Sequence, residues 1–322
     1  MHVAVYLPPR FYSGIASSVV ETLQVVNDVS GSDVFSFEFL AAQPNVVSRS
    51  GIHFPARARA SRKIDVLILL AGSGMESGRT VQLLEEEIMR VKPFILCAQK
   101  QGAIIAATCG ASYLLAGLGL LDGKRATISW WLKEEASRRF PRVRWEPSRL
   151  VVRQGRIYTT GAGFAGLELI TTLLIDLGFA KEERKVRKLM VLPPSRQFQS
   201  PYEMSLPRET DEFERKLDQL AKKHVQKLSL DFLAQELGMS PRTLSRRFLN
   251  ELQATAGKWI QGKRLEAART LLETTGLNVS EICYRVGYHD LASFSRLFSR
   301  TSGMTPVEFR KQVRSWRARP AG

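Results

Sequence analysis

The chain has 322 residues, 44% of them hydrophobic, and its 47 Lys and Arg residues outnumber 31 Asp and Glu residues, giving a formal net charge of +16. The hydrophobic content excludes a disordered chain, and the lack of an uninterrupted apolar run of about 18 residues argues against a membrane-spanning helix. The length allows two domains with their own cores, and the basic excess favours a polyanionic partner such as nucleic acid.

The first part of the chain alternates short apolar runs, typical of strands, with amphipathic runs, typical of helices. Strands are predicted at residues 3–7, 34–41, 65–70, 103–108, 125–129 and, as a hairpin, 151–160. Helices are predicted at residues 17–29, 80–91, 111–118, 167–177 and 181–192, with Pro93 opening a further one. This alternation predicts a doubly wound, flavodoxin-like α/β sandwich over residues 1–192.

A change in composition follows this region. Four prolines fall within 15 residues among Ser, Gln and Arg, which predicts a linker at 193–210. Beyond it no strand-like run occurs, so residues 211–322 are expected to form an all-α domain.

Three cysteines, Cys97, Cys109 and Cys283, lack the spacing of a metal site and cannot all pair with one another. We therefore expect no metal, no other cofactor and a reducing compartment. The apolar run at the start is too short for a signal peptide, and together these features predict a cytoplasmic protein with no membrane partner.

A helix-turn-helix is predicted between residues 229 and 252. Ser229 is suited to cap a first helix, Gly238 to end it, and Ser240 to cap the second helix, whose first residue is Pro241. Small Ala234 allows the two helices to cross closely. The outward positions of the second helix suit base edges and phosphates, and they are Arg242, Thr243, Ser245 and Arg246, with Arg247 as a further candidate.

A second copy follows at an offset of 50 residues, where FSRLF (294–298) matches LSRRF (244–248). Its turn is one residue longer, and its outward residues are Leu291, Ala292, Ser293, Ser295 and Arg296, followed by Arg300. A helix at 258–274, roughly 25 Å long, would hold the two reading helices about one DNA turn, roughly 34 Å, apart. The alternative, a basic helical bundle with solvated arginines, is less favoured because the motif occurs twice in fixed order.

The C-terminal third resembles the DNA-binding domain of AraC/XylS-type transcriptional regulators. The resemblance rests on AxxxGMSP at 234–241, RLxxA at 264–268, GY at 287–288 and GMTPxxFR at 303–310. It implies a transcriptional regulator of double-stranded promoter DNA. Activation is the expected direction, which would make RNA polymerase a partner.

Cys109 and Gly110 form a predicted sharp turn between a buried strand and a helix. The helix N-terminus would favour a thiolate nucleophile there, and Gly72-Ser73-Gly74 could offer backbone N–H groups to an anion. A hydrolase also needs a base within reach. Of the four histidines, only His53 is not excluded by its position in the sequence.

The first domain resembles the regulatory, GlxA-like branch of the PfpI-like, class I glutamine amidotransferase-like fold. The carrying segments are residues 109–130, 140–143 and YTTGAG at 158–163. That branch usually has Cys-Thr-Gly-Ala at the turn and a His before the Trp, whereas this chain has Cys109-Gly110-Ala111-Ser112 and Ser129. The resemblance therefore implies a non-catalytic domain in which Cys109 is a vestigial nucleophile.

We therefore expect residues 1–192 to sense an unidentified small-molecule effector and to form a homodimer. The expected pocket lies at the carboxyl edge of the sheet, where doubly wound folds bind ligands, near Gly72, Ser73, Cys109, Ser129 and Trp130. The alternative from another class is a thiol hydrolase or amidase fused to a DNA-binding module.

Overall fold

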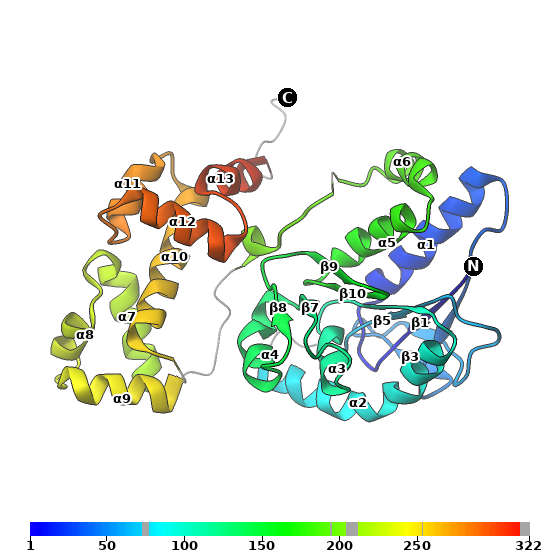
Figure 1. The fold of residues 1–322 in the computed structure, drawn as a ribbon, viewed down its shortest axis with the longest axis horizontal. Coiled ribbons are helices and arrows are strands. Elements are labelled where there is room, and N and C mark those ends of the chain that lie inside the picture. Colours follow the sequence, from blue (N-terminus) through cyan, green and yellow to red (C-terminus); the bar gives the residue numbers. More distant parts are fainter. Residues whose placement is uncertain (73–76, 194, 204–211, 253, 316–322) are drawn as a thin grey trace. The chain divides into compact units, whose positions relative to one another are not determined.

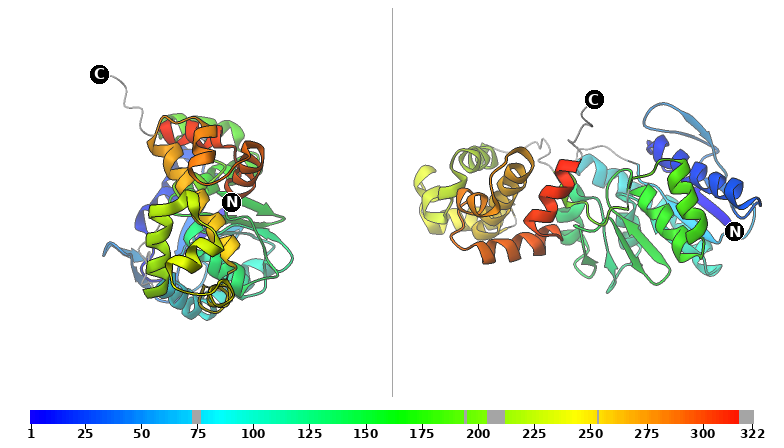
Figure 2. Two further views of the ribbon diagram at one scale, coloured as in Figure 1. Left: turned by 90° about the vertical axis from the view of Figure 1, so that its left-hand side faces the viewer. Right: turned by 90° about the horizontal axis from the view of Figure 1, so that it is seen from above.

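The computed structural model describes residues 1–72, 77–193, 195–203, 212–252 and 254–315 (Figures 1 and 2). The chain forms two compact units, Met1–Glu203 and Met204–Gly322, which are described separately below. Within the described residues, no helix combines the length and the apolar character needed to cross a bilayer.

Unit 1 is built on a six-stranded sheet with the order β2-β1-β5-β6-β10-β9. Its strands are β1 (His2–Tyr6), β2 (Ser36–Leu40), β5 (Val66–Leu69), β6 (Ile104–Ala107), β9 (Val151–Gln154) and β10 (Ile157–Thr160). All pairs are parallel except β9 with β10, which form the predicted hairpin at one edge. Numbered among themselves, the parallel strands run 2-1-3-4-5, which is the flavodoxin-like order and confirms the predicted fold class.

Helices cover both faces of this sheet (Figure 1). One face packs against α2 (Ser77–Lys100) and α3 (Ala111–Gly117), and the other against α1 (Ser13–Ser30), α5 (Ala165–Asp176) and α6 (Ala180–Leu189). Alternate residues of β1 enter opposite cores: Ala4 and Tyr6 face the α2 side, and Val3 and Val5 the α1 side. This is why the strands read as continuous apolar runs rather than alternating ones.

The prediction that Pro93 opens a new helix was wrong, because α2 runs through it without a break. Pro93 lies on the exposed side of the helix, while Val91, Ile95 and Ala98 are fully buried against the sheet. Their packing offsets the cost of proline inside a helix, roughly 3 kcal/mol.

Several short elements were missed or mislocated. The predicted strand at 125–129 is paired only over β7 (Arg125–Ala126), because the chain then turns into a 3₁₀ segment at Trp130–Leu132. The missed elements are the hairpin β3 (Asn45–Val47) and β4 (His53–Pro55), the helix α4 (Lys133–Arg139) and the strand β8 (Arg144–Trp145), which pairs with β7. Most of them are too short to show a periodic pattern.

Residue 192, the predicted domain end, lies inside unit 1, which continues to Glu203. Gln199 is buried, and its amide donates to the carbonyl oxygens of Pro147 at 2.7 Å and Ile128 at 2.8 Å. The first part of the predicted linker is therefore packed, apart from residue 194, which lies outside the described residues, as does the part from 204 to 210.

The described residues of unit 2 contain only helical elements and loops. The helices are α7 (Glu212–His224), α8 (Leu230–Glu236), α9 (Pro241–Leu252), α10 (Ala256–Thr274), α11 (Val279–Arg285), α12 (Leu291–Ser302) and α13 (Pro306–Ser315). One core cluster joins Phe213, Leu217, Leu244 and Phe248. The Phe298 ring packs edge-on against Phe309, with centroids 5.4 Å apart, which ties α12 to α13.

Candidate nucleic-acid interface and effector site

The first helix-turn-helix comprises α8 and α9, and its caps lie where the sequence predicts them. The Ser229 hydroxyl accepts the N–H of Phe232 at 3.0 Å, and the Ser240 hydroxyl accepts that of Thr243 at 3.1 Å. Gly238 has φ +63°, the left-handed conformation needed to end α8. These contacts fix the start of α9, the predicted reading helix, at Pro241.

The side chains of α9 divide into a buried face and an exposed face. Leu244 is fully buried, whereas Arg242 and Arg246 are exposed and have no ion-pair partner among the described residues. Of the other predicted residues, Thr243 and Ser245 are half-buried along the same face. Four predicted contact residues thus share one accessible surface.

Arg247 is placed differently from its neighbour. It forms an ion pair with Glu251 at 2.6 Å, and its guanidinium carbon lies 3.8 Å from the centroid of the Phe213 ring. These contacts make Arg247 part of the packing between α7 and α9, so we do not count it among the DNA-reading residues.

The second helix-turn-helix comprises α11 and α12. Sequence reasoning missed its capping box, in which the Asn278 side chain accepts the Glu281 N–H at 2.8 Å and the Glu281 carboxylate accepts the Asn278 N–H at 2.7 Å. The signal was present as Asn-x-x-Glu before an apolar run. The turn at 286–290 is one residue longer than the turn at 237–240, as predicted.

Asp290 caps α12 by accepting the Ser293 N–H at 2.7 Å, and this bonding lowers the pKa of the Asp290 carboxyl. The predicted contact residues line one side of the helix: Leu291, Ala292, Ser293 and Arg296 are exposed, and Ser295 is half-buried. Arg296 donates to the Ser293 hydroxyl at 3.0 Å. The guanidinium is thus restrained near the start of the helix, the part that reaches base edges in this motif.

The helix α10 contacts α7, α9, α11 and α13 and has 19 residues, which corresponds to about 28 Å. Arg264 on this helix was not singled out from the sequence as a linking residue. It donates to the Leu228 carbonyl oxygen at 2.9 Å, and its guanidinium carbon lies 5.4 Å from the Tyr288 ring centroid. Arg264 therefore connects the start of the first motif with the turn of the second.

In unit 1, Cys109 occupies the predicted turn between β6 and α3, with φ +56° and 4% of its surface exposed. The Ser129 hydroxyl donates to the Cys109 sulfur at 2.9 Å. No described histidine or carboxylate is hydrogen-bonded to that sulfur. A serine hydroxyl is too weak a base to activate a thiol, so the Ser129 contact positions Cys109 without supplying the second half of a catalytic dyad.

The residues predicted to form an effector pocket are only partly brought together. Ser129 contacts Cys109, and Gly72 follows the neighbouring strand β5. Gly72 lines a hollow of about 30 Å³ beside Leu84 and Glu87, with room for a water molecule or two rather than a metabolite. Ser73 lies outside the described residues. Over the described ranges, no group of three or more His, Cys, Asp and Glu side chains could hold a metal ion.

Comparison with known proteins gives matches over both units. Residues 233–312 match the family described as "Helix-turn-helix domain". The chain is 24% identical to the HTH-type transcriptional regulator GbdR of Pseudomonas aeruginosa, over 92% of this chain and 80% of that protein. It is 28% identical to the HTH-type transcriptional regulator GlxA of Rhizobium meliloti, over 66% of each protein.

Among solved structures, a mutant DJ-1 superfamily protein of Salmonella typhimurium has 20% identity and a TM-score of 0.46, covering 60% of this chain and 99% of the other. Residues 233–312 form an AraC-family helix-turn-helix domain, and the chain is a homologue of the GlxA and GbdR regulators.

Proposed function

We propose that the protein is a transcriptional regulator that recognises a specific sequence in double-stranded promoter DNA through α9 and α12. The observation that carries this proposal is the pair of capped helices, α9 and α12, each with an arginine, Arg246 or Arg296, exposed at the equivalent position. The major groove admits an α-helix, and each exposed face carries hydrogen-bond donors that base edges and phosphates accept. Both helices would enter successive major grooves.

We also propose that unit 1 is a non-catalytic sensor that binds a small-molecule effector and forms a homodimer. The non-catalytic role is supported by the Cys109 sulfur, to which no described histidine or carboxylate is hydrogen-bonded, and a regulatory role by the similarity to transcriptional regulators over most of the chain. As an activator, the protein would contact RNA polymerase, and we expect it to act in the cytoplasm. We keep Gly72, Ser73, Cys109, Ser129 and Trp130 as the proposed effector contacts at the carboxyl edge.

Genome-wide footprinting with and without candidate metabolites tests this function. We expect protected sites upstream of genes whose transcription changes when the protein is deleted. Protection that follows no sequence, with unchanged transcription, would contradict it.

A thiol hydrolase or amidase remains a second candidate, because Cys109 has the left-handed backbone conformation of a sharp strand-to-helix turn. Replacement of Cys109 by Ser separates the two functions. We expect DNA binding and regulation to persist and stability to change by no more than about 1 kcal/mol, since a hydroxyl also accepts from Ser129.

The measurements are reporter transcription and hydrolysis of a panel of amide substrates, with the exposed Cys97→Ser as control. Amide turnover by the native protein that disappears only in Cys109→Ser would establish the enzymatic alternative.

A further inference from the structure

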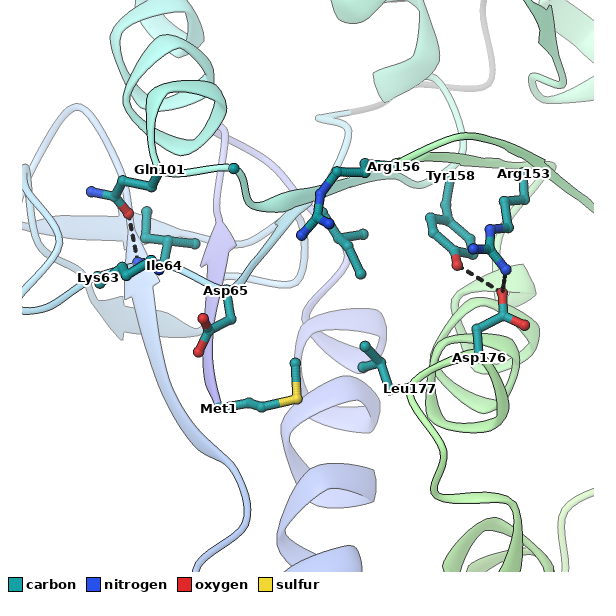
Figure 3. A pocket seen from close by; sticks show the side chains of 12 residues that line it. Met1, Lys63, Ile64, Asp65, Gln101, Arg153, Arg156, Tyr158, Asp176 and Leu177 are labelled. Carbon is teal, nitrogen blue, oxygen red and sulfur yellow. Dashed lines mark hydrogen bonds and ion pairs between the residues drawn. The ribbon is translucent and has the colours of Figure 1, made fainter.

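Unit 1 contains an open cavity of about 300 Å³, which lies at the other end of the sheet from Cys109 (Figure 3). It lies where the parallel strands begin: Met1 precedes β1, Asp65 precedes β5, Ile104 starts β6 and Arg156 precedes β10. The end of α5, with Asp176 and Leu177, closes one side. Cys109 lies two residues beyond the end of β6, so the two places are at opposite edges of the same sheet.

The carboxylates that line this cavity already have partners. Asp176 accepts the Tyr158 hydroxyl at 2.7 Å and pairs with Arg153 at 3.0 Å. The Asp65 carboxylate accepts the backbone N–H of His2 at 2.7 Å. Asp176 is therefore neutralised by Arg153, whereas Asp65, bonded to a neutral amide, keeps its negative charge.

Two cations of the lining have no ion-pair partner among the described residues, namely Arg156 and Lys63. Figure 3 shows the Arg156 guanidinium extending from the sheet into the space between Asp65 and Leu177. Arg156 is also close enough to Tyr158 to oppose the rise in the pKa of that phenol, which burial and Asp176 cause. Once Arg153 and Asp176 are paired, Lys63 and Arg156 outnumber the one remaining carboxylate, Asp65, so the cavity has a surplus of positive charge.

The uncharged part of the lining is mixed. Ile64, Ile104, Leu177 and the ring of Tyr158 supply apolar surface, and Gln101 supplies a polar side chain. The volume is at the lower end of the range for small-molecule sites. A guanidinium in such surroundings binds carboxylate or phosphate groups through paired hydrogen bonds.

We propose that this cavity binds a small organic anion whose carboxylate or phosphate pairs with Arg156, with its carbon chain against Leu177 and Ile104. The ligand would bridge residues at the starts of four strands, β1, β5, β6 and β10, and at the end of α5, so it would stabilise unit 1. Its action as an effector rests on the proposed regulatory function, whereas its binding does not.

Titration calorimetry on the full chain tests the site, with inorganic phosphate, glycerol phosphate, butyrate and succinate as probes at low chloride. At least one probe should bind, and the probes distinguish a phosphate from a carboxylate ligand. Arg156→Gln should weaken that binding about tenfold to a hundredfold, because it removes charge-assisted hydrogen bonds. The control is Arg144→Gln, an exposed arginine of β8 outside the cavity lining, which should bind as the native protein does.

Failure of all four probes to bind the native protein, or equal binding by both variants, overturns the proposal. A gel shift on the same samples reads DNA binding separately. Anion binding without sequence preference for DNA would contradict the regulatory function and leave this site standing.

Discussion

Replacing Arg296 or Arg246 with alanine should weaken specific DNA binding by about 1–3 kcal/mol each, or roughly fivefold to 150-fold in Kd. Each arginine is exposed on a capped helix, and Arg296 is already restrained by the Ser293 hydroxyl at 3.0 Å. The loss is expected to be this large because a guanidinium makes two hydrogen bonds to guanine that no alanine replaces. Gel shifts on cognate and scrambled DNA measure it.

The matched control is Arg247→Ala on the same helix α9. Arg247 is engaged with Glu251 and the Phe213 ring, so its loss should lower stability and leave sequence discrimination nearly unchanged. If Arg246→Ala and Arg296→Ala reduce binding to cognate and scrambled DNA equally, both residues contact phosphates and do not read bases.

Replacing Gly287 with alanine should destabilise unit 2 by roughly 2–3 kcal/mol. Gly287 has φ +88°, and a Cβ there would lie 2.6 Å from the Gln226 carbonyl oxygen and 2.8 Å from the Arg264 guanidinium. The strain would affect the turn of the second motif and Arg264, the residue that connects this turn to Leu228. Urea unfolding of the full chain measures the stability, and loss of specific DNA binding should accompany it.

Gly262→Ala is the matched control, because the same substitution at this position should have the opposite effect on stability. Gly262 lies in α10 with open space around its Cα, so alanine should stabilise the helix by up to about 1 kcal/mol. Similar effects of the two substitutions would show that the turn at Gly287 is not tightly packed.

Much of the fold could be predicted because its signals are local. The runs at 3–7, 65–70 and 103–108 are apolar on both faces, and the order of strands and helices then restricts the topology. The capping roles of Ser229, Ser240 and Gly238 each depend only on residues in the same turn, so the local sequence reveals them. In contrast, α2 continues through Pro93 because of packing against a sheet that the local sequence does not reveal.

The two candidate sites also differ in how far the local sequence reveals them. Reading-helix residues lie within five residues of one another on each helix, so spacing alone places them on one face. The ligand-binding cavity collects residues from Met1 to Leu177, which only the sheet topology brings together. The packing of Gln199 against Pro147 and Ile128 was likewise hidden, because its proline-rich surroundings are typical of a linker.

Selection of DNA from a random library by the full chain at moderate ionic strength tests the central claim most directly. We predict enrichment of one motif with two conserved blocks about 10 base pairs apart, one degraded by Arg246→Ala and the other by Arg296→Ala. Recovered sequences indistinguishable from the starting library would contradict the account of two reading helices acting on adjacent major grooves.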